Sequence, residues 1–443
     1  MPQEISGKTE TAPDSTHRRA LSKEIGLPPR YSFAITPSKG LEAAWTKILQ
    51  HSPSWFAQER VKYSALYCVL RGATIDESFP TVVVKAPHHV SDELLERYKE
   101  AVVVPAVNEE GCEEPAVEFL IGSVSRLWDW DERPKNFEYK EVLEMGIGVG
   151  TEGNTDNGGT IGGYLREKSK TENVFGITAH HVVSSQKKGL TPGDAVNVEN
   201  PAGCDMVDEQ DAIKKGFAAL ESEMEMEAQE AIERDRIGVG AEASTLYEPQ
   251  ETRESLDRRQ QILDEVKHKD KIVGTVVASS GLETRLWDQA NPRDAFTPKG
   301  SHYNIDWAIF KLSGVRPATN TSPYFSSDWI TDGVRVLDSA EESIPVWKVG
   351  RMTGRTAGET NGLRSQINLG DTLASVEMAA ISNNINFLKP GDSGAWLLDE
   401  RGKVLGLIIA GDAGESSDTA YYTPIDLLLK DVKDKAGLDL EVM

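Results

Sequence analysis

The sequence has few cysteines, few basic residues and no long apolar run. Its three cysteines, Cys68, Cys112 and Cys204, are an odd number and lie far apart, so they predict neither a disulfide framework nor a metal site. The longest apolar runs, such as Val404–Ala410, are far too short to span a bilayer. The N-terminal stretch is polar and lacks the apolar segment of a signal peptide. We therefore expect a cytoplasmic, intracellular protein without disulfides.

The deficit of basic residues excludes some classes of partner. The chain has 48 Lys and Arg against 71 Asp and Glu, a net charge of −23. Such a surface repels phosphates, which argues against sequence-independent binding of nucleic acid and against docking on anionic membranes. The length of 443 residues, 39% of them hydrophobic, is typical of a soluble protein of two or three domains.

The residue pattern divides the chain into a tail, a small mixed unit and a long β region. Residues 1–29 are polar and predict a disordered tail. Residues 30–135 mix helical and strand patterns, with Ser91 as a helix cap, and end in a polar linker over Trp128–Lys140. From 141 to 435, many short strands follow one another between turns, which favours a sandwich or barrel. The predicted strands include Ala65–Leu70, Pro80–Val84, Ala116–Ile121, Gly159–Leu165, Val174–Ala179, Val334–Leu337, Asn384–Leu388 and Thr419–Pro424.

Residues 205–268 break the β pattern, because they are acidic and have helical spacing. Two apolar stripes predict a helical hairpin inserted into the β domain. A solvated arm that packs on the barrel and an arm that binds a partner or regulates the protein both fit this pattern. The first stripe is Ile213, Phe217, Leu220 and Met224, and the second is Leu256, Leu263 and Val266.

Three short segments carry residue types that belong together in a hydrolase. Residues 176–183 (GITAHHVV) contain two histidines at the end of a predicted strand. Residues 304–312 (NIDWAIFKL) place an acid before an apolar strand, and residues 389–396 (KPGDSGAW) place a serine in a glycine-rich turn. A serine hydroxyl is a poor nucleophile until a base takes its proton. An imidazole can do so, and a buried carboxylate on its other nitrogen fixes the tautomer and stabilises the imidazolium.

The serine turn also suits the stabilisation of an oxyanion. A developing oxyanion needs fixed donors, and the backbone N–H groups of Gly391 and Ser393 would supply them. Glycines at 391 and 394 allow the backbone to turn sharply beside a substrate. All reacting groups are then protein groups, so we expect no metal and no cofactor. Asp392 is expected to hold the loop through hydrogen bonds.

The three segments resemble the signature regions of the chymotrypsin-like serine peptidases. ITAHHVV resembles their histidine motif, NIDWAIFKL their aspartate strand, and PGDSGAWLLD followed by VLGLIIAG their serine region. The order His, Asp, Ser also agrees. The resemblance covers 141–200 and 271–435, and it implies His181 as the base, Asp306 as the residue that orients it and Ser393 as the nucleophile.

The implied fold is mainly β, a chymotrypsin-like double β-barrel with an inserted helical hairpin and a small α/β domain before it. Asp306 and Ser393 are 87 positions apart, near the roughly 90 of the template. His181 and Asp306 are 125 apart, against roughly 45 in the template; the insertion over 205–268 supplies most of this surplus length, and longer loops would supply much of the rest. The absence of the usual disulfides implies an intracellular branch, such as the fungal S64-type peptidases with their non-catalytic N-terminal region.

Two alternatives concern individual residues. His180 competes with His181 as the base, although its side chain should point to the other side of the strand end. An α/β-hydrolase would need a G-x-S-x-G motif and a histidine after the serine. Position 395 is Ala and the last histidine is His302, which excludes that architecture if Ser393 is the nucleophile.

The resemblance also implies a substrate-binding region. Phe387 lies where the family's primary pocket has its floor, so a preference for Arg or Lys is disfavoured and an apolar P1 side chain is expected. An extended peptide would add as a strand along residues 409–411. The implied substrate-binding residues are Phe387, Ile409, Ala410, Gly411 and Ala420.

The first hypothesis from the sequence is a serine endopeptidase that acts on proteins or peptides. The rival is a catalytically inactive relative that serves as a binding or scaffolding module. The unit over 30–135 carries no catalytic motif, and we expect it to regulate or mask the peptidase, as a retained pro-segment would. This unit or the helical insertion could also bind a protein partner.

Overall fold

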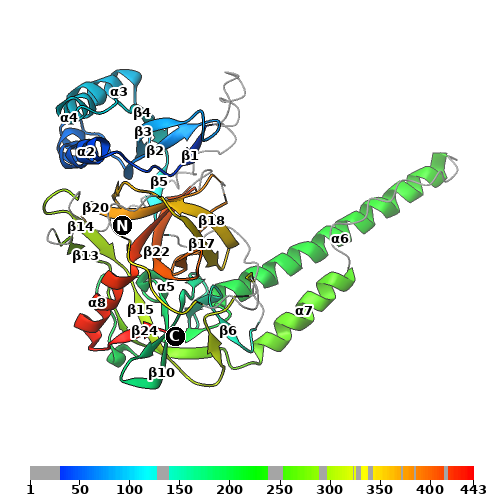
Figure 1. Ribbon diagram of the computed structural model, residues 1–443. Helices are drawn as coiled ribbons and strands as arrows, with labels where there is room; N and C mark the ends of the chain where they lie inside the picture. Colours follow the sequence, from blue (N-terminus) through cyan, green and yellow to red (C-terminus); the bar gives the residue numbers. More distant parts are fainter. Residues whose placement is uncertain are drawn as a thin grey trace, which may run out of the picture.

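The computed structural model describes residues 30–126, 139–237, 253–288, 297–322, 324–325, 331–337, 343–370, 373–383, 386–413 and 418–443. Figure 1 shows β units in the lower part of the molecule, a separate lobe above them and a long helical arm on one side. The predicted tail over 1–29 and most of the predicted linker over Trp128–Lys140 lie outside the described residues.

The first β unit is a sheet of eight antiparallel strands, with the C-terminal strand β24 at one edge. It remains open between β24 and β8, so it forms an incomplete barrel. Its core includes Val149, Tyr164 and Phe310. The strands are β7 (Gly148–Thr151), β8 (Gly159–Thr160), β9 (Gly163–Glu167), β10 (Lys170–Thr178), β11 (Asn197–Glu199), β12 (Ile272–Ser279), β15 (Ala308–Leu312) and β24 (Leu440–Val442).

The second β unit is a closed barrel, because pairing of β18 with β20 completes a ring of six strands. Helix α8 (Ile425–Ala436) follows it and buries Leu428 and Val432. The predicted mainly β, double-barrel architecture is therefore confirmed. The six strands are β17 (Pro345–Gly350), β18 (Gly354–Thr360), β20 (Ser375–Ile381), β21 (Trp396–Asp399), β22 (Val404–Ala413) and β23 (Thr419–Pro424).

The N-terminal unit is an α/β lobe whose sheet continues that of the second barrel. Strand β19 (Ser365–Ile367) pairs with β20 on one side and with β2 on the other. Ser38 caps α2 and Ser91 caps α3, the latter as predicted. The elements are β1 (Tyr31–Phe33), α2 (Lys39–Gln58), β2 (Ala65–Gly72), β3 (Phe79–Ala86), α3 (Asp92–Tyr98), a π-helical segment (Lys99–Val103), α4 (Val104–Glu110), β4 (Ala116–Ile121) and β5 (Ser123–Ser125).

The predicted helical hairpin is present as α6 (Gly203–Ile237) and α7 (Arg253–Lys267). The second stripe is buried as predicted. The first is buried only near the barrel: Ile213 is 1% exposed and Met224 is 62% exposed. The outer part of this stripe is exposed at Met224, because α6 extends beyond α7 and beyond the barrel (Figure 1).

Three predicted strands differ from the structure. Gly159–Leu165 forms two short strands, because the backbone at Gly162 passes against Gly394 and Trp396, and a Cβ at 162 would lie 2.5 Å from the Gly394 carbonyl. Val334–Leu337 forms only an isolated bridge, and Asn384–Leu388 lies partly outside the described residues and is otherwise not a strand. The remaining elements are β6 (Leu143–Glu144), α5 (His180–Val183), a 3-10 turn (Pro192–Asp194), β13 (Glu283–Leu286), β14 (His302–Ile305) and β16 (Ala318–Thr319).

Within the described ranges, no helix has the length and hydropathy to cross a membrane.

Candidate active site

The strand pairing of the first barrel brings His181 and Asp306 together. His181 lies in the short helix α5, directly after β10, and Asp306 directly precedes β15. Thr178 of β10 pairs with Ala308 of β15, so the end of one strand faces the start of the other. Nδ1 of His181 lies 2.7 Å from Oδ2 of Asp306, and the backbone N–H of His181 donates to Oδ1 at 3.1 Å. The carboxylate thus fixes both the ring and the main chain of the histidine.

A third group reaches the same carboxylate. Arg126, from the segment after β5, donates from Nε to Oδ2 of Asp306 at 2.9 Å, and both side chains are buried. Burial acts to raise the pKa of Asp306, but His181 and Arg126 outweigh it and hold the pKa below its ordinary value. The carboxyl is therefore ionised at neutral pH, and Nδ1 of His181 carries the proton of their hydrogen bond.

His180 is held by other partners. Its Nδ1 lies 2.8 Å from Oγ of Ser279, and its Nε2 lies 2.8 Å from the carbonyl oxygen of Gln186. Burial lowers its pKa, which favours the neutral ring in this packed position. Both ring nitrogens of His180 therefore have a structural use.

Ser393 lies in a turn between two glycines in the left-handed region, Gly391 (φ 94°) and Gly394 (φ 90°). A Cβ at position 394 would lie 2.4 Å from the carbonyl oxygen of Thr160 and 2.4 Å from Oγ1 of Thr178. The serine turn is thus pressed against the end of β10, just before the two histidines. The backbone N–H of Thr160 donates to the carbonyl of Ser393 at 2.8 Å. Oγ of Ser393 is buried and makes no hydrogen bond to another described residue.

Asp392 holds the serine turn from behind. Its Oδ2 accepts from Nζ of Lys348 at 2.9 Å, from Oγ1 of Thr353 at 2.7 Å and from the N–H of Lys389 at 3.1 Å. Its Oδ1 accepts from the N–H of Met352 at 2.8 Å. Lys348 and Asp392 are fully buried. Burial lowers the pKa of Lys348, and the carboxylate of Asp392 opposes that shift.

Comparison with known proteins places the chain in a family. Residues 134–442 match peptidase family S64. The chain belongs to peptidase family S64. It is a serine-type peptidase, a hydrolase, and the predicted resemblance is confirmed at the level of the family.

Solved structures with a similar chain path include bacterial serine proteases. A glutamic-acid-specific serine protease that uses a histidine triad in substrate binding is 12% identical, with a TM-score of 0.36 over 68% of this chain and 100% of its own. The Cellulomonas bogoriensis chymotrypsin is 14% identical, with a TM-score of 0.34 over 68% and 98%. Thermobifida fusca protease A is 13% identical, with a TM-score of 0.34 over 68% and 100%.

The predicted substrate-binding residues of the peptidase lie in two buried clusters. Phe387 and Ala420 belong to one, whereas Ile409 and Ala410 belong to another that includes Val124 of β5. Gly411 pairs with Ser125 of β5. The edge expected to take a peptide strand therefore carries a strand of the chain itself.

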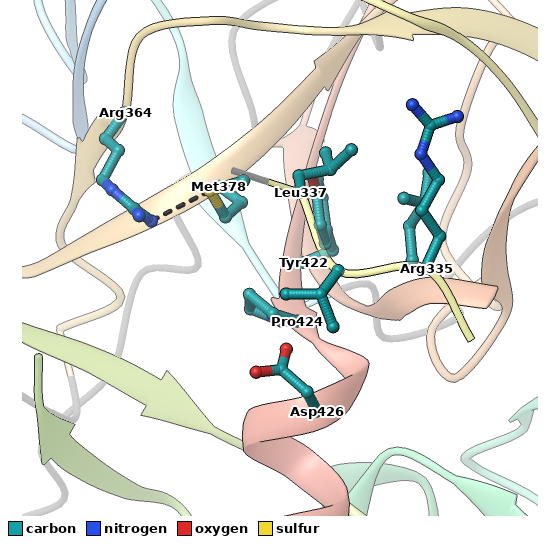
Figure 2. Close-up of a pocket in the computed structure, with 9 residues that line it drawn as sticks. Arg335, Leu337, Arg364, Met378, Tyr422, Pro424 and Asp426 are labelled. Carbon is teal, nitrogen blue, oxygen red and sulfur yellow. Dashed lines mark hydrogen bonds between the residues drawn. The ribbon is translucent and has the colours of Figure 1, made fainter. Parts of the chain in front are cut away.

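A small pocket lies elsewhere in the second barrel (Figure 2). It contains none of the predicted site residues. Arg364 donates to Sδ of Met378 across it at 2.9 Å. Its labelled lining residues are Arg335, Leu337, Arg364, Met378, Tyr422, Pro424 and Asp426.

The sequence reasoning missed Arg126 and Lys348. Arg126 lies just before the predicted linker, in a segment with no motif, and nothing local indicated its partner. Lys348 stands in a strand that was otherwise apolar, and a lone lysine in a buried strand calls for an anionic partner. That signal could have pointed to Asp392.

Proposed function

We propose that this S64 peptidase is an endopeptidase in which Ser393 is the nucleophile, His181 the general base and Asp306 the group that orients the base. The observation that carries the proposal is the buried hydrogen bond of 2.7 Å between His181 and Asp306, beside a serine turn that packs on the end of β10. Ionised Asp306 stabilises the imidazolium that forms when His181 takes the serine proton.

The backbone N–H groups of Gly391 and Ser393 form the proposed oxyanion hole. Neither donates a hydrogen bond to another described residue, so both remain for a developing oxyanion. The positive φ of Gly391 sets the direction of this turn without the steric cost that a side chain would bring. Preorganised donors of this kind usually contribute more to the rate than any other single term.

An apolar P1 preference belongs to the same proposal. Phe387 is fully buried among apolar neighbours and offers no charge to a basic side chain. A panel of matched peptides should give cleavage after apolar residues. Cleavage only after Arg or Lys would contradict this part of the proposal.

A fluorophosphonate probe tests the proposed nucleophile. We expect the probe to label the wild-type chain at Ser393 and to leave Ser393→Ala and His181→Ala unlabelled. Labelling of Ser393→Ala would assign the reactivity to another residue. Absence of labelling both in the wild-type chain and in Arg126→Met would favour the inactive binding or scaffolding module.

We further propose that the unit over 30–135 masks the peptidase in cis. Ser393 is fully buried and His181 is 2% exposed, so a protein substrate cannot reach them in this conformation. Strand β5 pairs with β22 through Gly411↔Ser125 and Asp412↔Val124, as an added substrate strand would. Strand β5 therefore occupies the proposed peptide-binding edge.

Two buried ion pairs hold the masking unit in place. Arg126 contacts Asp306, and Lys85 of β3 contacts Asp412 of β22 with both side chains buried. Removal of one partner of a buried pair leaves an uncompensated charge and is strongly destabilising. Each pair thus gives a way to loosen the mask by a single substitution.

A further inference from the structure

Arg351 lies fully buried in the turn between β17 and β18. Its Nε donates to Oδ1 of Asp205 at 2.6 Å, and its Nη2 donates to Sγ of Cys204 at 3.5 Å. Asp205 is in the first turn of α6, where a carboxylate also suits the helix dipole. A buried ion pair therefore joins the root of the helical hairpin to the second barrel.

The same arginine supports the serine turn. A Cβ at Gly391 would lie 2.7 Å from Nη1 of Arg351, so the guanidinium lies directly against the proposed oxyanion loop. The backbone N–H of Arg351 donates to Oγ1 of Thr160 at 3.0 Å, and that hydroxyl donates to the carbonyl of Gly391 at 2.9 Å. Arg351 thus acts on the placement of Gly391 through its side chain and through its main chain.

Three glycines close around the Arg351 side chain. A Cβ at Gly158 would lie 3.0 Å from Nη1, and a Cβ at Gly148 would lie 2.8 Å from Cδ and 2.9 Å from Oδ2 of Asp205. With Gly391 on the third side, there is little room for the guanidinium to move. A displacement of Asp205 would therefore move Arg351, and Arg351 would move the loop at Gly391 that its guanidinium contacts.

The helical hairpin is built to transmit such a displacement. Near the barrel, Arg259 of α7 makes two hydrogen bonds to Glu209 of α6, at 2.6 and 2.9 Å. Met206, Ile213 and Leu263 form a small core between the helices. The 35 residues of α6 make a helix about 50 Å long, and Figure 1 shows it projecting far from the barrels.

We propose that Arg351 is a positioning residue for the oxyanion loop and that its ion pair with Asp205 couples the helical hairpin to that loop. This inference rests on the proposed function for its kinetic consequence. A change in the seating of α6 would shift Arg351 and hence the N–H groups of Gly391 and Ser393. The position of the hairpin would then regulate the rate of the chemical step.

The test uses the full chain and three variants, which are Arg351→Met, Asp205→Asn and the two combined, with Arg351→Lys as the conservative variant. Hydrogen exchange of the peptide that contains 389–395 reports the loop directly. Turnover of a small ester, with each substitution placed in the Arg126→Met background, reports kcat and KM. Lys214→Met is the matched control, because it removes an exposed pair with Asp211 on α6 and leaves the Asp205–Arg351 and Glu209–Arg259 pairs intact.

We expect Arg351→Met to speed exchange of the loop at least about 10-fold and to lower kcat by about 10- to 100-fold, with KM within about twofold, as removal of oxyanion stabilisation does. The double variant should lose no more than Arg351→Met, since both act through one pair. Arg351→Lys should recover part of kcat, and Lys214→Met should match the chain without it.

Unchanged exchange and kcat in Arg351→Met and in the double variant would overturn the inference. Equal losses in Lys214→Met would also overturn it, because the effect would then not depend on the Asp205–Arg351 pair. If exchange responds as expected but no variant shows turnover that depends on Ser393, the loop support stands and the proposed function fails.

Discussion

Arg126 donates to the oxygen of Asp306 that also holds His181, at 2.9 Å. A guanidinium in this place neutralises the carboxylate that would stabilise a positive imidazole. Because Arg126 follows directly after β5, the strand that pairs with β22 along the proposed peptide-binding edge, one short segment would both cover that edge and occupy the acid of the proposed triad. In the proposed mask, steric cover and charge are thus joined in the same few residues.

Loss of Arg126 should open the site. We expect Arg126→Met to raise the rate at which a fluorophosphonate labels Ser393 by at least about 10-fold, since loss of a buried ion pair costs the docked segment several kcal/mol, about 3–5. Arg126→Lys should lie between this variant and wild type, because it keeps the charge but not the geometry. Arg97→Met is the control, since Arg97 pairs with Glu59 on the exposed surface of the same unit. An unchanged or slower rate in Arg126→Met would contradict the mask.

The buried Lys348–Asp392 pair should be needed for a stable serine turn. We expect Lys348→Met to lower the free energy of unfolding by about 3–5 kcal/mol, because Asp392 is left buried without its cation. The same substitution combined with Asp392→Asn should recover part of that loss. Denaturant unfolding measures both. Lys403→Met, which removes an exposed pair with Asp332, should lower the free energy of unfolding by less than about 1 kcal/mol. An equal loss at the two lysines would contradict the prediction.

The two adjacent histidines should separate in their effects. His181→Ala should lower kcat by at least about 10⁴-fold, as loss of a triad base does. His180→Ala should leave most of kcat but lower the melting temperature, because Ser279 and Gln186 lose their buried partner. Steady-state kinetics in the Arg126→Met background and thermal unfolding give the comparison. Equal kinetic losses in both variants would contradict the assignment of His181 as the base.

Much of this site could be predicted because its motifs are local in the sequence. Strand ends carry His181 and Asp306, and a glycine-flanked turn carries Ser393, so short segments were enough to propose them. The contacts of Arg126 and Arg351 could not be predicted. Arg126 lies 180 positions from its partner Asp306, and Arg351 lies 146 positions from its partner Asp205, and no spacing rule links residues so far apart. The exposure of the outer part of α6 could not be predicted for a related reason. A periodic apolar stripe indicates a helix, but it does not say whether a neighbouring element is long enough to cover the stripe.

The stability of the folded chain should fall as the pH rises, in part because of Glu377. This residue is fully buried in β20 and accepts from the backbone N–H of Asn304 at 2.7 Å. Burial raises its pKa to about 7, against about 4.3 in an unfolded chain. Between these values the folded state keeps a proton that the unfolded state has lost, so the free energy of unfolding decreases from about pH 4 to about pH 7 and levels off above.

Substitution of Glu377 by Gln should remove this dependence. We expect the free energy of unfolding of Glu377→Gln, relative to wild type, to rise by about 3 kcal/mol between pH 4.5 and 7.5. Denaturant titrations at the two pH values measure it. The control is Glu172→Gln on the exposed part of β10, whose difference from wild type should be the same at both pH values. If the difference in free energy of unfolding between Glu377→Gln and wild type is also the same at both pH values, the buried carboxyl of Glu377 does not keep its proton in the folded state.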